Sequence, residues 1–338
     1  WQRVLTQQFH DIIPGSSIAW VHDDAEAEHA AVAQEVGQLL DSVLSPRTDG
    51  STWLMNPAPV AISGVVDVNG VAQWVEVSAM SGTQHFSSEV PSHVARVSFT
   101  EAEGELELTN GIMQVKWNSL GEMIDLRDCQ SGRSLLGGDR VSSFVLRQDT
   151  PAEYDAWDID MTDANAPAIS LVADSVPVVV ESSPLRATVE CLFATDASRL
   201  VVRYSLCAAS EQLDVSLEAD WHEQERRLQW SLPTDLRALD ATCGTQFGHV
   251  RRARHSNTTW DIARFEVCAH RYVAVSEPSF GAAILADGPR GYDIRGNSLR
   301  LTVLRSPRFP DPEADLGAQR LTWAVMLTPG DAITHGIE

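Results

Sequence analysis

Short runs of alternating apolar and polar residues recur from residue 51 to residue 304, and they constrain the fold more than any other feature of the chain. Successive side chains of a β-strand point to opposite faces of a sheet, so a period of two is typical of strands with one buried face. Turn signals separate the runs at intervals of about ten residues, which favours antiparallel sheets packed face to face. We therefore predict a mainly β protein.

The alternating region divides into two parts. Residues 51–100 contain short runs joined by turns such as Asn69-Gly70 and predict a small β-domain. Residues 101–338 show hardly any helical pattern and predict one large antiparallel β-sandwich. The segments expected to be strands are Trp53–Pro57, Gly64–Val68, Gln73–Val77, Val94–Phe99, Leu106–Leu108, Met113–Trp117, Met123–Leu126, Val178–Val180, Thr188–Leu192, Leu200–Tyr204, Leu213–Leu217 and Leu301–Leu304.

Residues 1–45 form the helical part of the chain. One helix is expected over Trp1–Phe9, and apolar residues at helical spacing predict another over Asp24–Leu44. Asp23 and Asp24 suit the N-terminus of the second helix, because carboxylates favour the positive end of the helix dipole. The two form a helical hairpin that needs a third partner to cover its apolar stripes, as in a three-helix bundle. Residues 45–50 are interpreted as a linker.

An imidazole and a carboxylate stand side by side at the end of the first predicted helix. His10-Asp11 is followed by Pro14-Gly15, which breaks the backbone before Ser16 or Ser17 can cap the next helix. Such an arrangement presents polar chemistry at a helix end. The pair is also compatible with a purely structural role, in which the imidazole lies near the negative end of the helix dipole.

Charge and cysteine content limit the partners and the setting. The chain of 338 residues has a net charge of −22, which repels nucleic acid and anionic membranes. It contains no apolar run long enough to span a bilayer. Five cysteines at scattered spacing indicate reduced thiols, most of them buried in strands, and hence a cytoplasmic protein. The chain opens at Trp1 inside a helical pattern, so we expect it to be a fragment.

Several stretches resemble the α-mannosidases of glycoside hydrolase family 38, in particular its bacterial and cytosolic members. The longest is Gln8–Ile18, which is similar to the signature of the family's helical middle domain. The resemblance extends over essentially the whole chain. Its other stretches are Asn110–Met113, Leu120-Gly121, Asp128–Leu135, Asp155–Asp160, Asn257–Val267, Leu304–Pro307 and Pro310–Asp315. Where the family pattern after Asp315 usually continues Arg-Gly-x-His, this chain reads Leu316-Gly317-Ala318-Gln319.

The resemblance implies a zinc-dependent retaining enzyme that hydrolyses terminal α-D-mannosyl residues. It assigns His10 as a zinc (Zn²⁺) ligand and Asp11 as a residue that binds the mannose hydroxyls. The sandwich is then a supersandwich of the galactose mutarotase-like type. The nucleophile, the acid/base carboxylate and three of the four zinc ligands belong to an N-terminal catalytic barrel that has no match here, so the chain holds no catalytic residue and is expected to be inactive alone.

The partners that the resemblance implies are an α-mannoside or mannose-containing oligosaccharide and the catalytic domain of the same protein. Neither nucleic acid nor a membrane is expected as a partner, and homo-oligomerisation is compatible with the sequence. A further small β-domain is expected after Glu338.

Three alternatives stay open. His22, Glu26 and His29 have the spacing of metal ligands on one helix face, although a solvated face explains them better. The acidic run from Glu153 to Asp163 could bind calcium, but it lacks the glycine-containing EF-hand pattern. The chain could also be a non-catalytic module that braces an enzyme or binds carbohydrate through exposed tryptophans. An accessible His10 would favour the enzyme, and an enclosed His10 the module.

Overall fold

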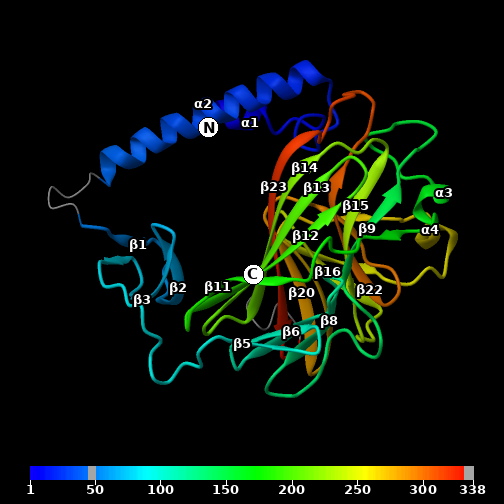
Figure 1. The fold of residues 1–338 in the computed structure, drawn as a ribbon. Coiled ribbons are helices and arrows are strands. Elements are labelled where there is room, and N and C mark those ends of the chain that lie inside the picture. The colour runs from blue at the N-terminus through cyan, green and yellow to red at the C-terminus, as the bar shows by residue number, and fades with distance from the viewer. Residues whose placement is uncertain (45–50, 331–338) are drawn as a thin grey trace.

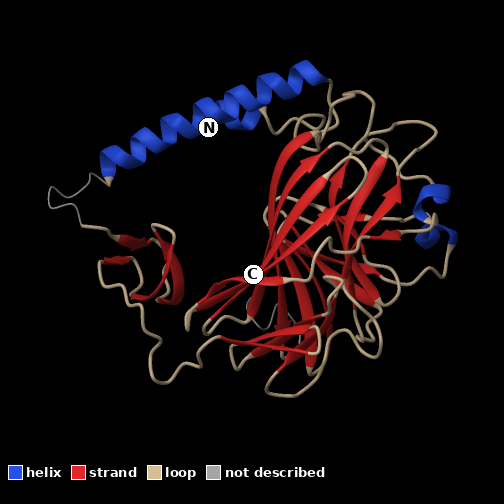
Figure 2. Ribbon diagram, in the orientation of Figure 1, coloured by secondary structure: helices blue, strands red, loops and turns tan. Residues whose placement is uncertain are grey.

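The computed structural model describes residues 1–44 and 51–330 of the chain. Figure 1 shows a helical segment, a small β unit and a large sandwich that contains most of the strands. Strands dominate the ribbon in Figure 2, so the predicted mainly β fold is confirmed. The predicted linker at residues 45–50 lies outside the described residues.

The helical segment differs from the prediction at both helices. Helix α1 (Gln2–Thr6) ends before Phe9, and residues 7–15 form a series of turns. Helix α2 (Ala19–Val43) begins earlier than predicted, because the carbonyl of Ile18 already accepts hydrogen bonds from the next turn. Ile18 is therefore the N-cap residue in place of Ser16 or Ser17, and Asp23 and Asp24 lie inside the helix.

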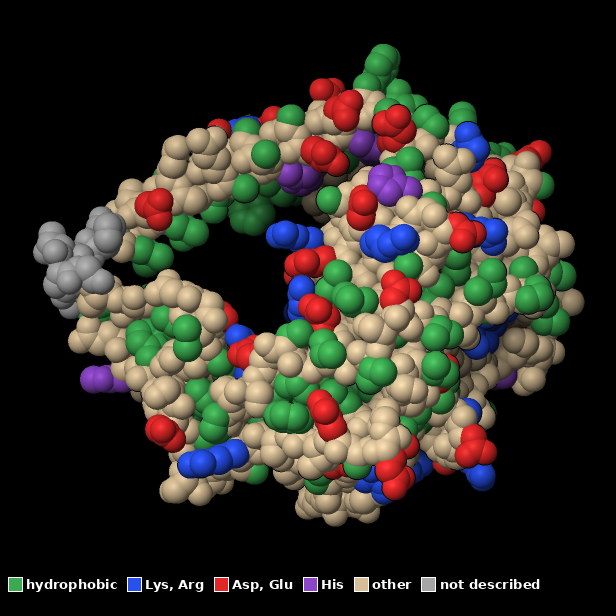
Figure 3. Space-filling view, viewed as in Figure 1, with side chains coloured by type: hydrophobic (Ala, Val, Ile, Leu, Met, Phe, Trp, Pro, Cys, Tyr) green, Lys and Arg blue, Asp and Glu red, His purple; other side chains and the backbone are tan. Residues whose placement is uncertain are grey.

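The apolar stripe of α2 is mostly uncovered in the described part of the chain. Ala25 is its only buried residue, whereas Leu39 and Val43 are 65% and 80% exposed. In Figure 3, apolar side chains gather beneath the end of the helix that is nearer to the small β unit. A helix that exposes an apolar stripe normally buries it against another element. The third partner expected from the sequence is not among the described residues.

The small β unit consists of two antiparallel pairs. Its strands are β1 (Leu54–Asn56) with β4 (Ser81–Thr83), and β2 (Ile62–Val68) with β3 (Val71–Val77). The predicted turn at Asn69-Gly70 is confirmed. Both residues have positive φ, 54° and 82°, as a two-residue hairpin turn requires, and the amide of Gly70 donates to Asp67.

The remaining strands form a four-stranded, a six-stranded and a nine-stranded sheet, and every described pairing within them is antiparallel. The four-stranded sheet contains β5 (Ser98–Ala102), β6 (Glu105–Thr109), β7 (Met113–Trp117) and β8 (Met123–Asp128). The six-stranded sheet runs in the order β10 (Ile169–Ser170), β9 (Ser143–Gln148), β15 (Arg226–Pro233), β22 (Ser298–Arg305), β21 (Gly291–Asp293) and β18 (Val267–Cys268). The nine-stranded sheet runs in the order β11 (Val178–Ser182), β12 (Arg186–Ala194), β13 (Arg199–Cys207), β14 (Gln212–Trp221), β23 (Gly317–Thr328), β20 (Phe280–Ala286), β19 (Tyr272–Glu277), β16 (Asp240–Thr245) and β17 (Gly248–Ala253).

One predicted strand is misplaced. Val94–Phe99 overlaps β5 only at its last two residues, because β5 begins at Ser98. Strand β5 pairs with β6 and crosses residue 100, the boundary expected between the two β-domains. That boundary therefore falls inside a hairpin.

Alternating residues of the sheets build one large core, beside a small second cluster of Tyr272, Ala274 and Ala283. In β13, Leu200, Val202, Tyr204 and Leu206 are at most 2% exposed, and the residues between them face outward. Trp230 of the six-stranded sheet lies against Trp323 of the nine-stranded sheet, with ring centroids 5.8 Å apart. Full burial of one large apolar side chain stabilises the fold by about 1.5–3 kcal/mol. The period of two therefore determines which face of each strand enters the core.

Two short helices lie on the outside of the sandwich, at its far side from the small β unit (Figure 2). They are α3 (Met161–Ala164) and α4 (Thr259–Ile262). Thr258 and Asp261 form a reciprocal capping box at the start of α4. Among the described residues, no helix is both long and apolar enough to cross a membrane.

Candidate functional site

His10 and Asp11 lie in the turns between α1 and α2. Their side chains are 78% and 45% exposed, and His10 Nε2 is 3.4 Å from Asp11 Oδ2. The ring of Phe9 packs beside the imidazole at a centroid distance of 4.4 Å. The pair is thus accessible on an open surface. The predicted position at a helix end is wrong, because α1 ends at Thr6 and the pair lies in the turns that follow.

Backbone hydrogen bonds hold the segment that carries the pair. The amides of Ile12 and Ile13 both donate to the carbonyl of Phe9, and Gly15 donates to Ile12. Gly15 has φ of +69°, a conformation that glycine adopts without steric cost. Pro14-Gly15 therefore breaks the backbone as predicted, and His10 and Asp11 project from a compact run of turns.

His22 ties the same segment to the sandwich. Its Nε2 accepts the backbone N–H of Ser17 at 3.2 Å, and its Nδ1 is 2.8 Å from Oδ2 of Asp311. The metal hypothesis for His22, Glu26 and His29 is not supported, because both ring nitrogens of His22 already have partners. The solvated-face interpretation is also wrong for His22, which is only 20% exposed.

A zinc site is not complete within the described residues. They contain no group of three or more histidine, cysteine or acidic side chains that could hold a metal ion. A zinc ion normally takes four ligands, or three protein ligands and a water. His10 offers one suitable nitrogen and Asp11 an adjacent carboxylate, so the donor set fits part of a zinc site and requires further ligands from outside the described residues.

The acidic run from Glu153 to Asp163 does not form a calcium site. Asp155 accepts the backbone amides of Arg308 and Phe309, Asp160 accepts the amide of Ala152, and Asp163 accepts the amide of Thr150. These carboxylates fasten the loop instead of converging on one point. The structure therefore favours the structural interpretation of the acidic run.

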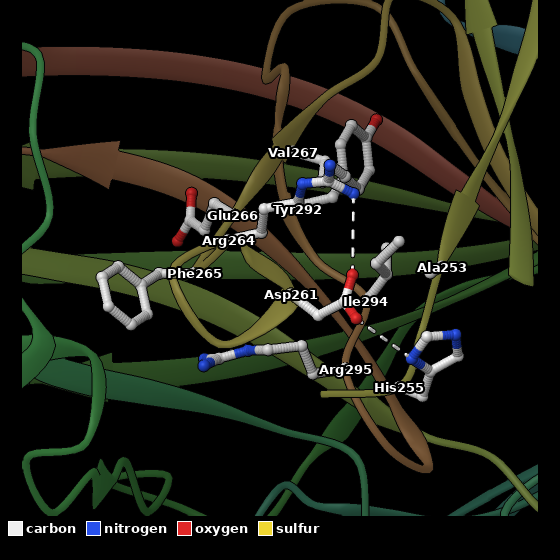
Figure 4. Close-up of a pocket in the computed structure, with 10 residues that line it drawn as sticks. All are labelled: Ala253, His255, Asp261, Arg264, Phe265, Glu266, Val267, Tyr292, Ile294 and Arg295. Carbon is white, nitrogen blue, oxygen red and sulfur yellow. Dashed lines mark ion pairs between the residues drawn. The ribbon is translucent and has the colours of Figure 1, made fainter. Parts of the chain in front are cut away.

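The cavity in Figure 4 is not a binding site for a sugar. It lies between α4 and β21 and has a volume of about 10 Å³, room for a single water molecule. Figure 4 shows Asp261 between His255 and Arg264, at 3.5 and 3.9 Å. The cavity is too small for a sugar, and none of its lining residues comes from the helical segment.

A larger groove of about 490 Å³ lies over β13, β14, β20 and β23 of the nine-stranded sheet. Gln212, Asp214 and Arg271 line it, and burial raises the pKa of Asp214. Its aromatic lining residue, Trp323, is only 4% exposed. The exposed tryptophans Trp157 and Trp260 do not line this groove, so it lacks the aromatic surface that the carbohydrate-binding alternative needs.

A buried ionic network underlies the loops of the six-stranded sheet. Arg305 on β22 contacts Asp149 and the backbone carbonyls of Ala156 and Asp158. Asp149 is 1% exposed, and burial raises the pKa of its carboxyl although Arg305 opposes the shift. No pattern in the sequence predicts the network, although Arg305 belongs to Leu304–Pro307, one of the stretches that carry the family resemblance.

Asp293 on β21, which pairs with Arg295 and Arg300, shows the opposite balance of burial and charge, and this leads to a testable prediction. Burial disfavours its charge, but hydrogen bonds from Arg295 and the charges of Arg295 and Arg300 outweigh burial and lower its pKa. The ionised form is therefore favoured on folding. Its contribution is present above the unfolded pKa of about 3.9 and is lost as the pH falls through the lower folded pKa.

We expect Asp293→Asn to lower the free energy of unfolding at neutral pH by about 1–3 kcal/mol, because two arginines lose a charged partner. The loss should shrink as the pH drops below about 4. Urea unfolding at several pH values measures both effects. Asp139→Asn, at an exposed aspartate, is the matched control. A deficit that is constant with pH would contradict the assignment.

The five cysteines are free. Cys191 and Cys243 are buried, Cys207 is intermediate, and Cys129 and Cys268 are exposed. Burial raises the pKa of Cys191 to about 12 and of Cys243 to about 11, which keeps these thiols protonated. The prediction of reduced thiols is confirmed. The prediction that most of the cysteines are buried is wrong, because only Cys191 and Cys243 are.

Two family models match the chain. The model described as "Glycosyl hydrolases family 38 C-terminal domain" matches residues 108–313, and the model described as "Alpha mannosidase middle domain" matches residues 1–45. The second match includes His10, Asp11 and His22. Together the two matches cover the helical segment and most of the sandwich.

Similar sequences are named α-mannosidases. Alpha-mannosidase 2C1 of Homo sapiens is 30% identical over 358 residues, which cover 100% of this chain and 34% of the relative. An Alpha-mannosidase of Saccharomyces cerevisiae is 28% identical over 340 residues, covering 96% of this chain and 30% of the relative. The chain thus spans about a third of the length of the curated relatives it matches.

The fold is similar to that of a solved α-mannosidase from Enterococcus faecalis V583, with a TM-score of 0.75 and 15% identity. The match covers 98% of this chain and 50% of that structure. At this identity the likeness establishes the fold alone. It includes the helical segment as well as the sandwich, since nearly the whole chain is aligned.

Proposed function

The chain belongs to glycosyl hydrolase family 38, and on that premise we propose that the full-length protein containing it is a zinc-dependent retaining α-mannosidase. It would hydrolyse terminal α-D-mannosyl residues of α-mannosides or mannose-containing oligosaccharides. The observation that carries the proposal is the accessible His10–Asp11 pair, in a segment that matches the α-mannosidase middle domain. The other site residues would come from a catalytic domain elsewhere in the same protein.

Each residue of the pair has a distinct role in this proposal. His10 holds zinc through a ring nitrogen, which its exposed position leaves accessible. When bound, zinc stabilises negative charge on sugar oxygens as a Lewis acid. Asp11 accepts hydrogen bonds from mannose hydroxyls. Such bonds are worth several kcal/mol in glycosidases when they strengthen as the sugar approaches its transition state.

The chain alone is proposed to be inactive. One imidazole and one adjacent carboxylate do not make a zinc site, and the described residues contain no further group of metal ligands. We also propose a cytoplasmic location, which the five free cysteines support.

The test compares the full-length protein with the isolated chain on an aryl α-mannoside. We expect the full-length protein to release mannose with retained configuration, followed by proton NMR, and the isolated chain to neither hydrolyse the substrate nor bind zinc specifically in a titration. Inversion, or no turnover by the zinc-loaded full-length protein, would contradict the enzymatic proposal. Turnover by the isolated chain that His10→Ala abolishes would contradict its inactivity.

A further inference from the structure

The contact between His22 and Asp311 joins two parts of the chain that are 289 residues apart in sequence. His22 lies in the first turns of α2, and Asp311 lies in the loop between β22 and β23. Their side chains are 20% and 10% exposed, so water has little access to the bond. Figure 3 shows histidine side chains gathered where the helical segment meets the sandwich.

The hydrogen bond from the backbone N–H of Ser17 determines which ring nitrogen of His22 carries the proton. The N–H of Ser17 can only donate, so Nε2 of His22 must accept and carries no proton. The ring proton of the neutral imidazole is therefore on Nδ1, which donates to Oδ2 of Asp311. One side chain thus satisfies a backbone donor of the turns and a carboxylate of the sandwich at the same time.

The loop that holds Asp311 is itself fixed on several sides. The amide of Arg305 donates to Asp315, and the second carboxylate oxygen of Asp311 accepts the amide of Glu313. The ring N–H of Trp221, a fully buried residue, donates to the hydroxyl of Ser306 at 2.6 Å. His22 is therefore bonded to a firm part of the sandwich.

The ion pairs within the helical segment are more exposed. Arg3 of α1 pairs with Glu28 and Glu35 of α2, and these side chains are 40%, 33% and 63% exposed. Solvent screens such pairs, whereas the bond between His22 and Asp311 is largely shielded. The Arg3 pairs also fasten α1 to α2 only, so they do not orient the turns relative to the sandwich.

We propose that His22 is a positioning residue, which with Asp311 sets the placement of the turns that carry His10 and Asp11. The inference rests on the proposed function, because it assigns His22 a part in placing one wall of that site. Both ring nitrogens of His22 are bonded within the protein, so its proposed role is to act through its neighbours and not on metal or substrate. It acts through Ser17, whose amide it fixes at the C-terminal end of the turns.

The experiment uses the full-length protein with His22→Ala, Asp311→Ala, Asp311→Asn and His22→Asn. Asp311→Asn keeps an amide oxygen that can accept from Nδ1, and His22→Asn keeps a donor near the position of Nδ1. His29→Ala, at an exposed histidine on the same helix, is the matched control. The measurements are hydrogen exchange of residues 8–18, zinc affinity by chelator competition, and kcat and KM.

We expect His22→Ala and Asp311→Ala to accelerate exchange at Ser17, to weaken zinc binding, and to lower kcat/KM by about 10- to 100-fold, as misplacement by about 1 Å can do. Asp311→Asn and His22→Asn should recover part of each loss. Merely reduced stability would leave the zinc affinity of the folded fraction unchanged, so affinity separates positioning from folding.

The proposal is overturned if His22→Ala equals His29→Ala in exchange, zinc affinity and kinetics. It is also overturned if the asparagine variants recover nothing while both proteins remain folded by circular dichroism. If the unsubstituted protein hydrolyses no α-mannoside, the proposed function fails, and exchange at Ser17 still decides whether His22 holds the turns.

Discussion

Replacing His10 with alanine in the full-length protein is expected to remove bound zinc and to lower kcat/KM on an aryl α-mannoside by about a thousandfold or more. A Lewis acid supplies several kcal/mol of charge stabilisation, and each 1.36 kcal/mol corresponds to about a tenfold change in rate. The side chain is 78% exposed, so its removal leaves no cavity, and the fold should be unaffected. Metal analysis of the purified protein and steady-state kinetics measure the two effects.

A substitution of Asp11 is expected to separate the loss of zinc from the loss of activity. Asp11→Asn should retain zinc and lose activity, because it removes the carboxylate that would bind the sugar and leaves the imidazole in place. His29→Ala should retain both. Zinc content of His10→Ala equal to that of the unsubstituted protein would contradict the ligand assignment, whatever the activity.

The largest effect on stability is expected from Arg305→Ala. Its guanidinium pairs with Asp149, which is 1% exposed, and bonds the carbonyls of Ala156 and Asp158. Removing one partner of a buried pair costs about 3–5 kcal/mol, and Asp149 is then left with the longer contact to Nη1 of Arg227, at 3.9 Å. We expect a loss of that size in the free energy of unfolding, measured by urea denaturation followed by tryptophan fluorescence.

Further variants separate charge from packing. Arg305→Lys should recover only part of the loss, since an ammonium group cannot form the same set of bonds as the planar guanidinium. Adding Asp149→Asn to Arg305→Ala should recover another part, because it removes a buried charge that has lost its hydrogen-bonded partner. Arg320→Ala, at an exposed arginine on β23, is the control. A double variant as unstable as Arg305→Ala alone would show that the buried charge is not the cause.

Much of the fold follows from local sequence patterns. Residues 113–117 form a strand with the predicted bounds, and Asn69-Gly70 forms the predicted hairpin turn. Strand periodicity and turn chemistry depend on neighbouring residues, so a single sequence contains them. Helix ends were less predictable, because the start of α2 depends on the conformation of the preceding turns as well as on nearby carboxylates.

Some features of the candidate site also follow from the local sequence, whereas others depend on the fold. The adjacency of His10 and Asp11 and the break at Pro14-Gly15 are properties of the sequence, and its resemblance to a known family indicated their roles. The bond from His22 to Asp311 could not be predicted, since no local pattern relates residues so far apart.

The sequence by itself therefore determined which faces of the strands are buried, where the chain turns, and which two polar side chains stand together near its beginning. Only the tertiary structure decided that the acidic run from Glu153 to Asp163 binds backbone amides and that His22 bonds to Asp311 instead of offering a metal ligand. The physical reason is that periodicity and turn propensity are local, whereas the partner of a buried polar group is selected by the path of the whole chain.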